Sequence, residues 1–304
     1  MSGNEQMALT AEADFLRDQI QALPAQAKLT RSSLEARLRT VSKELALAPA
    51  AAPARRLQLT FSGEPVERSR SIEAQFGGKA VSLFTEAVAL TAASFSGTEL
   101  KSGGPVPGGR DRRLRVVGAA LGSFGFELEL PPPDPAALPG LFPDDEVDAL
   151  EATMAMLEQA LIGDEEALSE VLSVVDLRAA RKLGEFVKLT VDRRALFTVR
   201  FEGRRLSVPD QEAARRAATA LRVDDVQQKP VTLRATLTGL RASKPDFECV
   251  REGDEEVILG AIDRSADIGA LRFLLGKTAL FRFRQTTVRQ TKPRYVLLGV
   301  EDGG

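Results

Sequence analysis

Five short apolar stretches near the end of the chain decide the fold: VTLRATLTGL at Val231–Leu240, FECV at Phe247–Val250, VILGAI at Val257–Ile262, TALFRFRQTTV at Thr278–Val288 and RYVLLGV at Arg294–Val300. β-Branched and aromatic residues are frequent in them, and turn-forming Gly, Pro and Asp residues lie between them, which is typical of strands. Between the third and fourth stretches, the segment Asp267–Leu275 predicts a short helix.

This succession of five strands, with one helix between the third and the fourth, resembles an OB-like barrel. We therefore expect residues 229–304 to form a small closed β-barrel, with an SH3-like barrel as the near alternative. The resemblance concerns the fold alone, and a fold of this kind hosts many unrelated functions. Any function must be argued from the side chains that the barrel displays.

The fourth strand places two kinds of side chain on opposite faces, because side chains alternate along a strand. In the segment 281–284 (FRFR) the phenylalanines are predicted to fill the barrel and the arginines to point outward. The basic surface continues around the next hairpin with one aromatic, which predicts a charge-driven contact without sequence preference. The candidate residues for binding nucleic acid or an acidic partner are Arg282, Arg284, Arg289, Lys292, Arg294 and Tyr295.

Charge is divided sharply along the chain, although the net charge is only −2. Residues 131–176 contain twelve acids and no Lys or Arg, and residues 177–222 contain twelve basic residues and five acids. Residues 265–300 contain seven basic residues and one acid. Two interpretations stay open: the acidic helices cover the basic surfaces within the chain, or the charges serve a partner.

Residues 1–47 are predicted to form a helical hairpin or a short coiled coil. Pro24 interrupts the helical pattern, and Ser32 three residues before Glu35 predicts a second helix that begins after Ser32 with a capping box. Both apolar seams are as narrow as those of coiled coils, so they favour packing on each other or on the next domain, or association with a partner helix. The candidate oligomerisation residues are Leu16, Ile20, Leu23, Leu34, Leu38, Val41 and Leu45.

The chain as a whole is expected to belong to the α+β class. A Pro/Ala linker at residues 48–56 precedes a mixed region at 57–228, which forms one or two subdomains before the barrel begins. The expected elements of the mixed region are a strand from Leu57, a helix over Ile72–Val88, a hairpin ending at Leu130, two or three helices over 139–187, a hairpin over Phe197–Val208 and a helix over Pro209–Leu221.

The residue types that are missing narrow the possible chemistry. The chain has no His and one Cys, which excludes His-based nucleophile pairs and cysteine zinc clusters. Gly276-Lys277-Thr278 resembles the end of a P-loop but lacks the first glycine of that loop, so it does not predict a nucleotide site. We expect no cofactor. A carboxylate enzyme with a divalent metal held by Asp144, Asp145 and Asp148 is the catalytic alternative.

The sequence therefore favours a non-catalytic binding or assembly protein. Its N-terminal helices would contact another protein or a second copy, and the basic barrel face would contact nucleic acid or an acidic partner. A purely structural subunit is the other alternative. We expect a cytoplasmic protein without membrane contact, because the start of the chain lacks a signal-peptide pattern, the chain has a lone Cys, and no apolar run is long enough to span a bilayer. The Ala- and Arg-rich composition favours a bacterial source.

Overall fold

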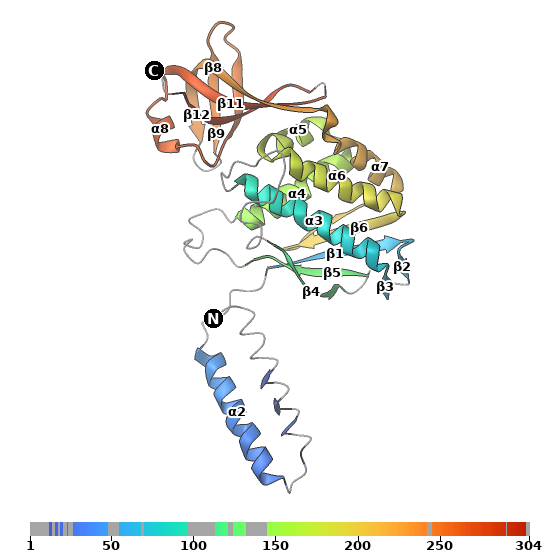
Figure 1. Cartoon of the computed structure of the whole chain (residues 1–304). Helices are drawn as coiled ribbons and strands as arrows, with labels where there is room; N and C mark the ends of the chain where they lie inside the picture. Colours follow the sequence, from blue (N-terminus) through green and yellow to red (C-terminus); the bar gives the residue numbers. More distant parts are fainter. Residues whose placement is uncertain are drawn as a thin grey trace. The chain divides into compact units, whose positions relative to one another are not determined.

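The computed structural model describes residues 12–13, 16–17, 19–20, 23, 27–47, 55–67, 70–95, 113–120, 124–131, 145–241, 245–289 and 291–301. The chain divides into two compact units, Met1–Arg55 and Arg56–Gly304. The expected α+β class is confirmed, with seven α-helices and a closed five-stranded barrel among the described residues (Figure 1).

The first unit contains helix α2 (Lys28–Leu47) and parts of the segment that precedes it. Leu16 and Val41 are buried together with Ala13, and Leu34 and Leu38 pack against them. Ile20 and Leu23 are half-buried, and the side chain of Leu45 lies outside the described residues. The hairpin itself stays a prediction, because the first helical segment is described only in part.

The predicted capping box at Ser32 is wrong. Helix α2 begins at Lys28, so Ser32 and Glu35 lie inside the helix and not at its start. The physical reason is the distance from Pro24: the chain can resume a helix within one turn of that break, and the exposed Ser32 side chain is tolerated in the interior of a surface helix.

The second unit begins with an antiparallel sheet of five strands in the order β4-β5-β1-β6-β7. One face of the sheet is apolar because the side chains alternate along each strand, as Leu57, Leu59 and Phe61 do in the central strand. A short hairpin, β2 (Val66–Glu67) with β3 (Ser71–Ile72), precedes the first helix of this unit. The sheet strands are β1 (Arg56–Gly63), β4 (Arg115–Ala120), β5 (Phe124–Glu129), β6 (Ala195–Phe201) and β7 (Arg204–Ser207).

Helices cover the apolar face of this sheet (Figure 1). A cluster of phenylalanine rings joins the two layers, and the ring centroids of Phe186 and Phe197 are 4.8 Å apart. Asp210 caps the last of these helices, so Pro209 lies before the helix and not in its first turn as predicted. The helices are α3 (Ala74–Phe95), α4 (Asp145–Ile162), α5 (Glu165–Val174), α6 (Leu177–Asp192) and α7 (Gln211–Ala220).

The predicted five-stranded barrel is confirmed as a closed barrel with the strand order β10-β12-β11-β8-β9. Neighbouring strands are antiparallel except for β10 and β12, which pair in parallel. The buried side chain of Leu271 packs into the barrel core from the short helix. The elements are β8 (Val226–Arg241), β9 (Asp246–Arg251), β10 (Val257–Ile262), α8 (Ile268–Arg272), β11 (Thr278–Val288) and β12 (Arg294–Val300).

The two longest barrel strands also belong to the helical layer. Strand β8 begins at Val226, five residues before the predicted Val231, and it pairs with β11 as far as Val226 and Val288. Both of these valines are buried in the core formed by the sheet and its helices. The barrel keeps a separate core of its own, but the ends of β8 and β11 extend into the core of the sheet and its helices. The sheet, its helices and the barrel form one compact unit.

Candidate functional site: the basic barrel face and its junction with the helices

The strand that carries the predicted basic surface shows the expected alternation. Phe281 and Phe283 are fully buried in the barrel core, whereas Arg282 is exposed. The next outward-facing residue, Arg284, is half-buried and lies opposite Val296 of β12, which is 1% exposed. Val296 points away from the barrel core, so its burial means that another part of the protein covers the outer face at this point.

Two acids at the start of α5 bind two of the predicted basic residues. The Arg289 guanidinium lies 2.5 Å from the Glu165 carboxylate, and it also donates to the backbone carbonyl of Thr219 at 2.8 Å. Arg294 lies 2.8 Å from the Glu166 carboxylate. Thr291, between the two arginines in the chain, is 3.3 Å from the Ser169 hydroxyl of the same helix. The hairpin between β11 and β12 thus lies against α5.

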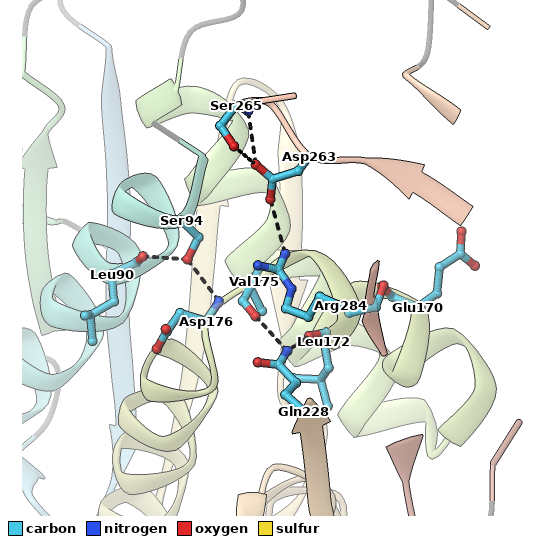
Figure 2. Close-up of polar contacts among 11 residues, drawn as sticks. Leu90, Ser94, Glu170, Leu172, Val175, Asp176, Gln228, Asp263, Ser265 and Arg284 are labelled. Atoms are coloured by element: carbon cyan, nitrogen blue, oxygen red, sulfur yellow. Dashed lines mark hydrogen bonds and ion pairs between the residues drawn. The ribbon is translucent and has the colours of Figure 1, made fainter. Parts of the chain in front are cut away.

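Arg284 binds an acid that belongs to the barrel itself. Its guanidinium lies 3.5 Å from Asp263, a carboxylate that also accepts hydrogen bonds from the backbone and the hydroxyl of Ser265 (Figure 2). The Asp263 side chain is only 13% exposed, so this pair is better shielded from solvent than an ordinary surface ion pair. Arg284 is therefore a structural residue of the junction in this arrangement.

Sequence reasoning missed an arginine that contacts two different helices at this junction. Arg264, in the loop after β10, lies 2.6 Å from Asp145 and 2.5 Å from Asp148, both in the first turn of α4. Its guanidinium also lies 4.5 Å from the centroid of the Phe95 ring at the end of α3. The run of acids around position 145 indicates that a basic residue lies nearby. The sequence alone does not show which basic residue this is.

Backbone groups complete the junction (Figure 2). The Gln228 side chain, from β8, donates to the carbonyls of Leu172 (3.2 Å) and Val175 (3.4 Å) at the C-terminal end of α5. Ser94 of α3 accepts from the backbone N–H of Asp176, which precedes α6. These contacts satisfy polar groups that helix ends leave unpaired, so they fix the directions of α5 and α6.

The remaining predicted residues of the basic surface have different surroundings. Arg282 and Lys292 are exposed, and neither forms an ion pair with an acid in the part of the chain that the structure describes. Tyr295 is half-buried, its ring packs 6.0 Å from that of Phe283, and its hydroxyl accepts from Gln285. Burial raises the Tyr295 pKa above its ordinary value. Its ring is committed to the barrel core and is not displayed for base stacking.

The outer surface of β9 and β10 is apolar at its centre. Val257 is 56% exposed and Leu259 is 62% exposed, and Val257 lies directly opposite Val250 on the neighbouring strand. The hairpin that these strands form carries six acids and one Arg between Asp246 and Val257. An apolar strip with an acidic rim is typical of a surface that contacts a protein, and it repels a phosphate backbone.

The described residues offer no assembled site for metal or thiol chemistry. Among them, no three Asp, Glu or Cys side chains lie close enough together to hold a metal ion. Asp145 and Asp148 bind Arg264, and Asp144 lies outside the described part of the chain. Burial raises the pKa of the Cys249 thiol to about 12, so the reactive thiolate is absent at neutral pH.

Comparison with known proteins adds no identity: no family model, no curated protein and no solved structure matches this chain. No helix in the described ranges is long and apolar enough to cross a bilayer.

Proposed function

We propose that this chain is a non-catalytic binding protein, and that its barrel is of the OB-like kind and contacts a partner protein through the outer face of β9 and β10. The barrel supports the first part of the proposal by its strand order. The second strand in sequence lies between the first and third, the fifth lies between the third and fourth, and a helix joins the third to the fourth.

The observation that carries the proposal is the distribution of exposed apolar side chains. Five of the eight large hydrophobic residues that are exposed in the described part of the chain belong to the barrel. They are Val257, Leu259, Phe273, Leu275 and Leu280. In OB-like barrels the face of the second and third strands is the usual ligand surface, and here that face consists of β9 and β10.

The charges around this face favour a protein partner over nucleic acid. Glu248 lies opposite Leu259 on the neighbouring strand, and Glu255 is exposed in the turn. The predicted basic surface lies elsewhere on the barrel, and Arg284, Arg289 and Arg294 in it already bind acids of this chain. The partner expected is a protein with an apolar patch and basic residues around it.

Site-specific photocrosslinking tests this contact. A photoreactive phenylalanine at position 259 is expected to form one discrete protein adduct in cells that naturally make the protein, and Val257→Ser is expected to weaken that adduct. The matched control is position 162, where Ile162 is similarly exposed (69% against 62% for Leu259) but belongs to α4. No adduct at position 259, the same adducts at position 162, or an adduct with nucleic acid would each refute the proposal.

We also propose that the N-terminal unit associates with a second helix pair. The support is the size of its core, in which only Ala13, Leu16 and Val41 are buried among the described residues. Leu34 and Leu38 of α2 are only half-buried, and association with a second helix pair would bury them further. Light scattering with and without residues 1–47 tests this. The ratio of the measured mass to the mass of one chain should fall when these residues are removed, and an unchanged ratio would refute the proposal.

A further inference from the structure

The face of the five-stranded sheet opposite the helices, called the open face below, is polar. Alternation along the strands sends Gln58, Thr60 and Thr198 to this face, because their chain neighbours Leu59 and Val199 are buried under the helices. The register places Glu127, Gln58, Arg200 and Arg205 in one row across β5, β1, β6 and β7. Arg200 and Arg205 of this row are exposed.

Arg200 and Arg205 lie directly opposite each other on neighbouring strands. A tight turn at Glu202 and Gly203, both with positive φ, fixes this register. Like charges at directly opposed positions destabilise a sheet, and neither guanidinium forms an ion pair with an acid that the structure describes. Arg205 donates only to the hydroxyl of Ser207.

Neighbouring arginines differ from this pair, because they have acidic partners. Arg204 points to the helical side of the sheet and binds Glu158 of α4. Arg56 lies 3.6 Å from Glu127 on the open face. The strands place four arginines and two acids on the open face, a net charge of +2. Both acids pair with Arg56, so Arg115, Arg200 and Arg205 have no ion pair with an acid that the structure describes. The charged residues of this face are Arg56, Arg115, Arg200, Arg205, Glu127 and Glu129.

A shallow hollow of about 460 Å³ lies over these residues. Its charged lining consists of four arginines and two acids: Arg56, Arg200, Arg204, Arg205, Glu127 and Glu202. A second copy of the sheet would bring arginine against arginine, so it is an unsuitable occupant. Helix α2 of the N-terminal unit carries five basic residues and two acids, so it too has the wrong charge. The hollow is open, and a small anion in it would stay largely solvated.

We propose that this open sheet face binds the phosphate backbone of a nucleic acid. Arginine, Gln, Ser and Thr side chains are the groups that proteins use to contact phosphate and sugar, and they are the groups present here. The face has no exposed aromatic ring among its described residues, so binding is charge-driven and independent of base sequence. This inference does not depend on the barrel contact proposed above.

Fluorescence anisotropy with a labelled 20-nucleotide single strand and the matching duplex, over a NaCl series, tests this surface. Arg200→Gln with Arg205→Gln is expected to weaken binding at least tenfold at 50 mM NaCl. The slope of log affinity against log salt should fall by about 1.4 for the single strand or about 1.8 for the duplex, because two phosphate contacts are lost. Gln58→Glu, which leaves both guanidiniums in place, is expected to weaken binding as well.

The matched control is Lys79→Gln with Arg181→Gln, which removes the same number of charges from exposed positions of α3 and α6. This variant should bind within twofold of the unmodified protein, and thermal unfolding should show that all variants remain folded. The proposal is overturned if the unmodified protein binds neither oligonucleotide at 50 mM NaCl. It is also overturned if the two double variants lose affinity equally, or if a polyglutamate peptide of equal charge competes as well as the unlabelled oligonucleotide.

Discussion

A single guanidinium, that of Arg264, contacts two carboxylates and one aromatic ring from two different helices. The side chains of Arg264, Asp145 and Asp148 are each about one-third exposed, so solvent screens the ion pairs only in part. Exposed ion pairs contribute roughly 0.2–1 kcal/mol each, and a cation over an aromatic ring adds about 0.5–1 kcal/mol. This one arginine therefore joins the loop after β10 to both α3 and α4.

Replacing this arginine should therefore destabilise the protein measurably. Arg264→Gln is expected to lower the free energy of unfolding by about 1–2 kcal/mol, because both carboxylates and the Phe95 ring lose their partner. Urea unfolding measures the change. Arg282→Gln on the exposed barrel surface is the control and should stay within about 0.5 kcal/mol of the unmodified protein. Equal effects of the two substitutions would contradict the role of Arg264.

Cys249 offers a pH-dependent test at the same scale. Its thiol pKa is raised to about 12 by burial, above the value of 9.0 for a free thiol. The thiol therefore stays protonated, and iodoacetamide at pH 8.5 should modify the folded protein far more slowly than the urea-unfolded chain. Because the folded pKa is the higher one, the contribution of Cys249 to stability is full below pH 9 and is lost as the pH rises towards 12. Rapid labelling of the folded protein would contradict this burial.

At the scale of elements, the closure of the barrel depends on the close approach of β10 and β12. A Cβ atom at Gly260 would lie 2.0 Å from the backbone carbonyl oxygen of Tyr295 on the parallel neighbour and 3.0 Å from the Phe247 ring. The backbone leaves no room for a side chain there, so glycine is required by the pairing of the two strands.

Gly260→Ala should open this seam of the barrel. We expect the free energy of unfolding to fall by about 1–3 kcal/mol, the usual range for overpacking. Amide hydrogen exchange should also become faster in β10 and β12 than in β8. Gly78→Ala in α3 is the control, because a Cβ there meets nothing within 4 Å. A Gly260→Ala protein with unchanged stability and exchange would show that the two strands are not paired as described.

The sequence predicts elements well where one face is buried and the period is clear. The alternation at 281–284 assigns Phe281 and Phe283 to the barrel core, and the structure confirms it. The sequence pattern does not predict that β8 begins at Val226, because Pro230 interrupts the strand pattern. The burial of Val226 also depends on helices that are distant in the chain. Arg264 is missed for a similar reason: its partners are more than a hundred residues away in sequence.

At the scale of the whole molecule, the charge division seen in the sequence has an internal counterpart. Acids of α4 and α5 bind arginines of the barrel at Arg264, Arg289 and Arg294. This arrangement supports the interpretation in which acidic helices cover part of the basic surface. It leaves two surfaces for partners: the apolar face of β9 and β10, proposed for a protein, and the open sheet face with Arg200 and Arg205, proposed for nucleic acid.

Arg289 and Arg294 hold the barrel to the acidic helix α5, and a charge-swap cycle measures how much these ion pairs contribute. Three variants are compared by urea unfolding: Arg289→Glu with Arg294→Glu, Glu165→Arg with Glu166→Arg, and all four changes together. Each double reversal is expected to lower the free energy of unfolding by about 1–3 kcal/mol, because like charges then face each other. The variant with all four changes should recover most of the lost free energy of unfolding, because each ion pair is restored with its charges exchanged. If the two losses simply add in the fourfold variant, the ion pairs do not form and the claim is wrong.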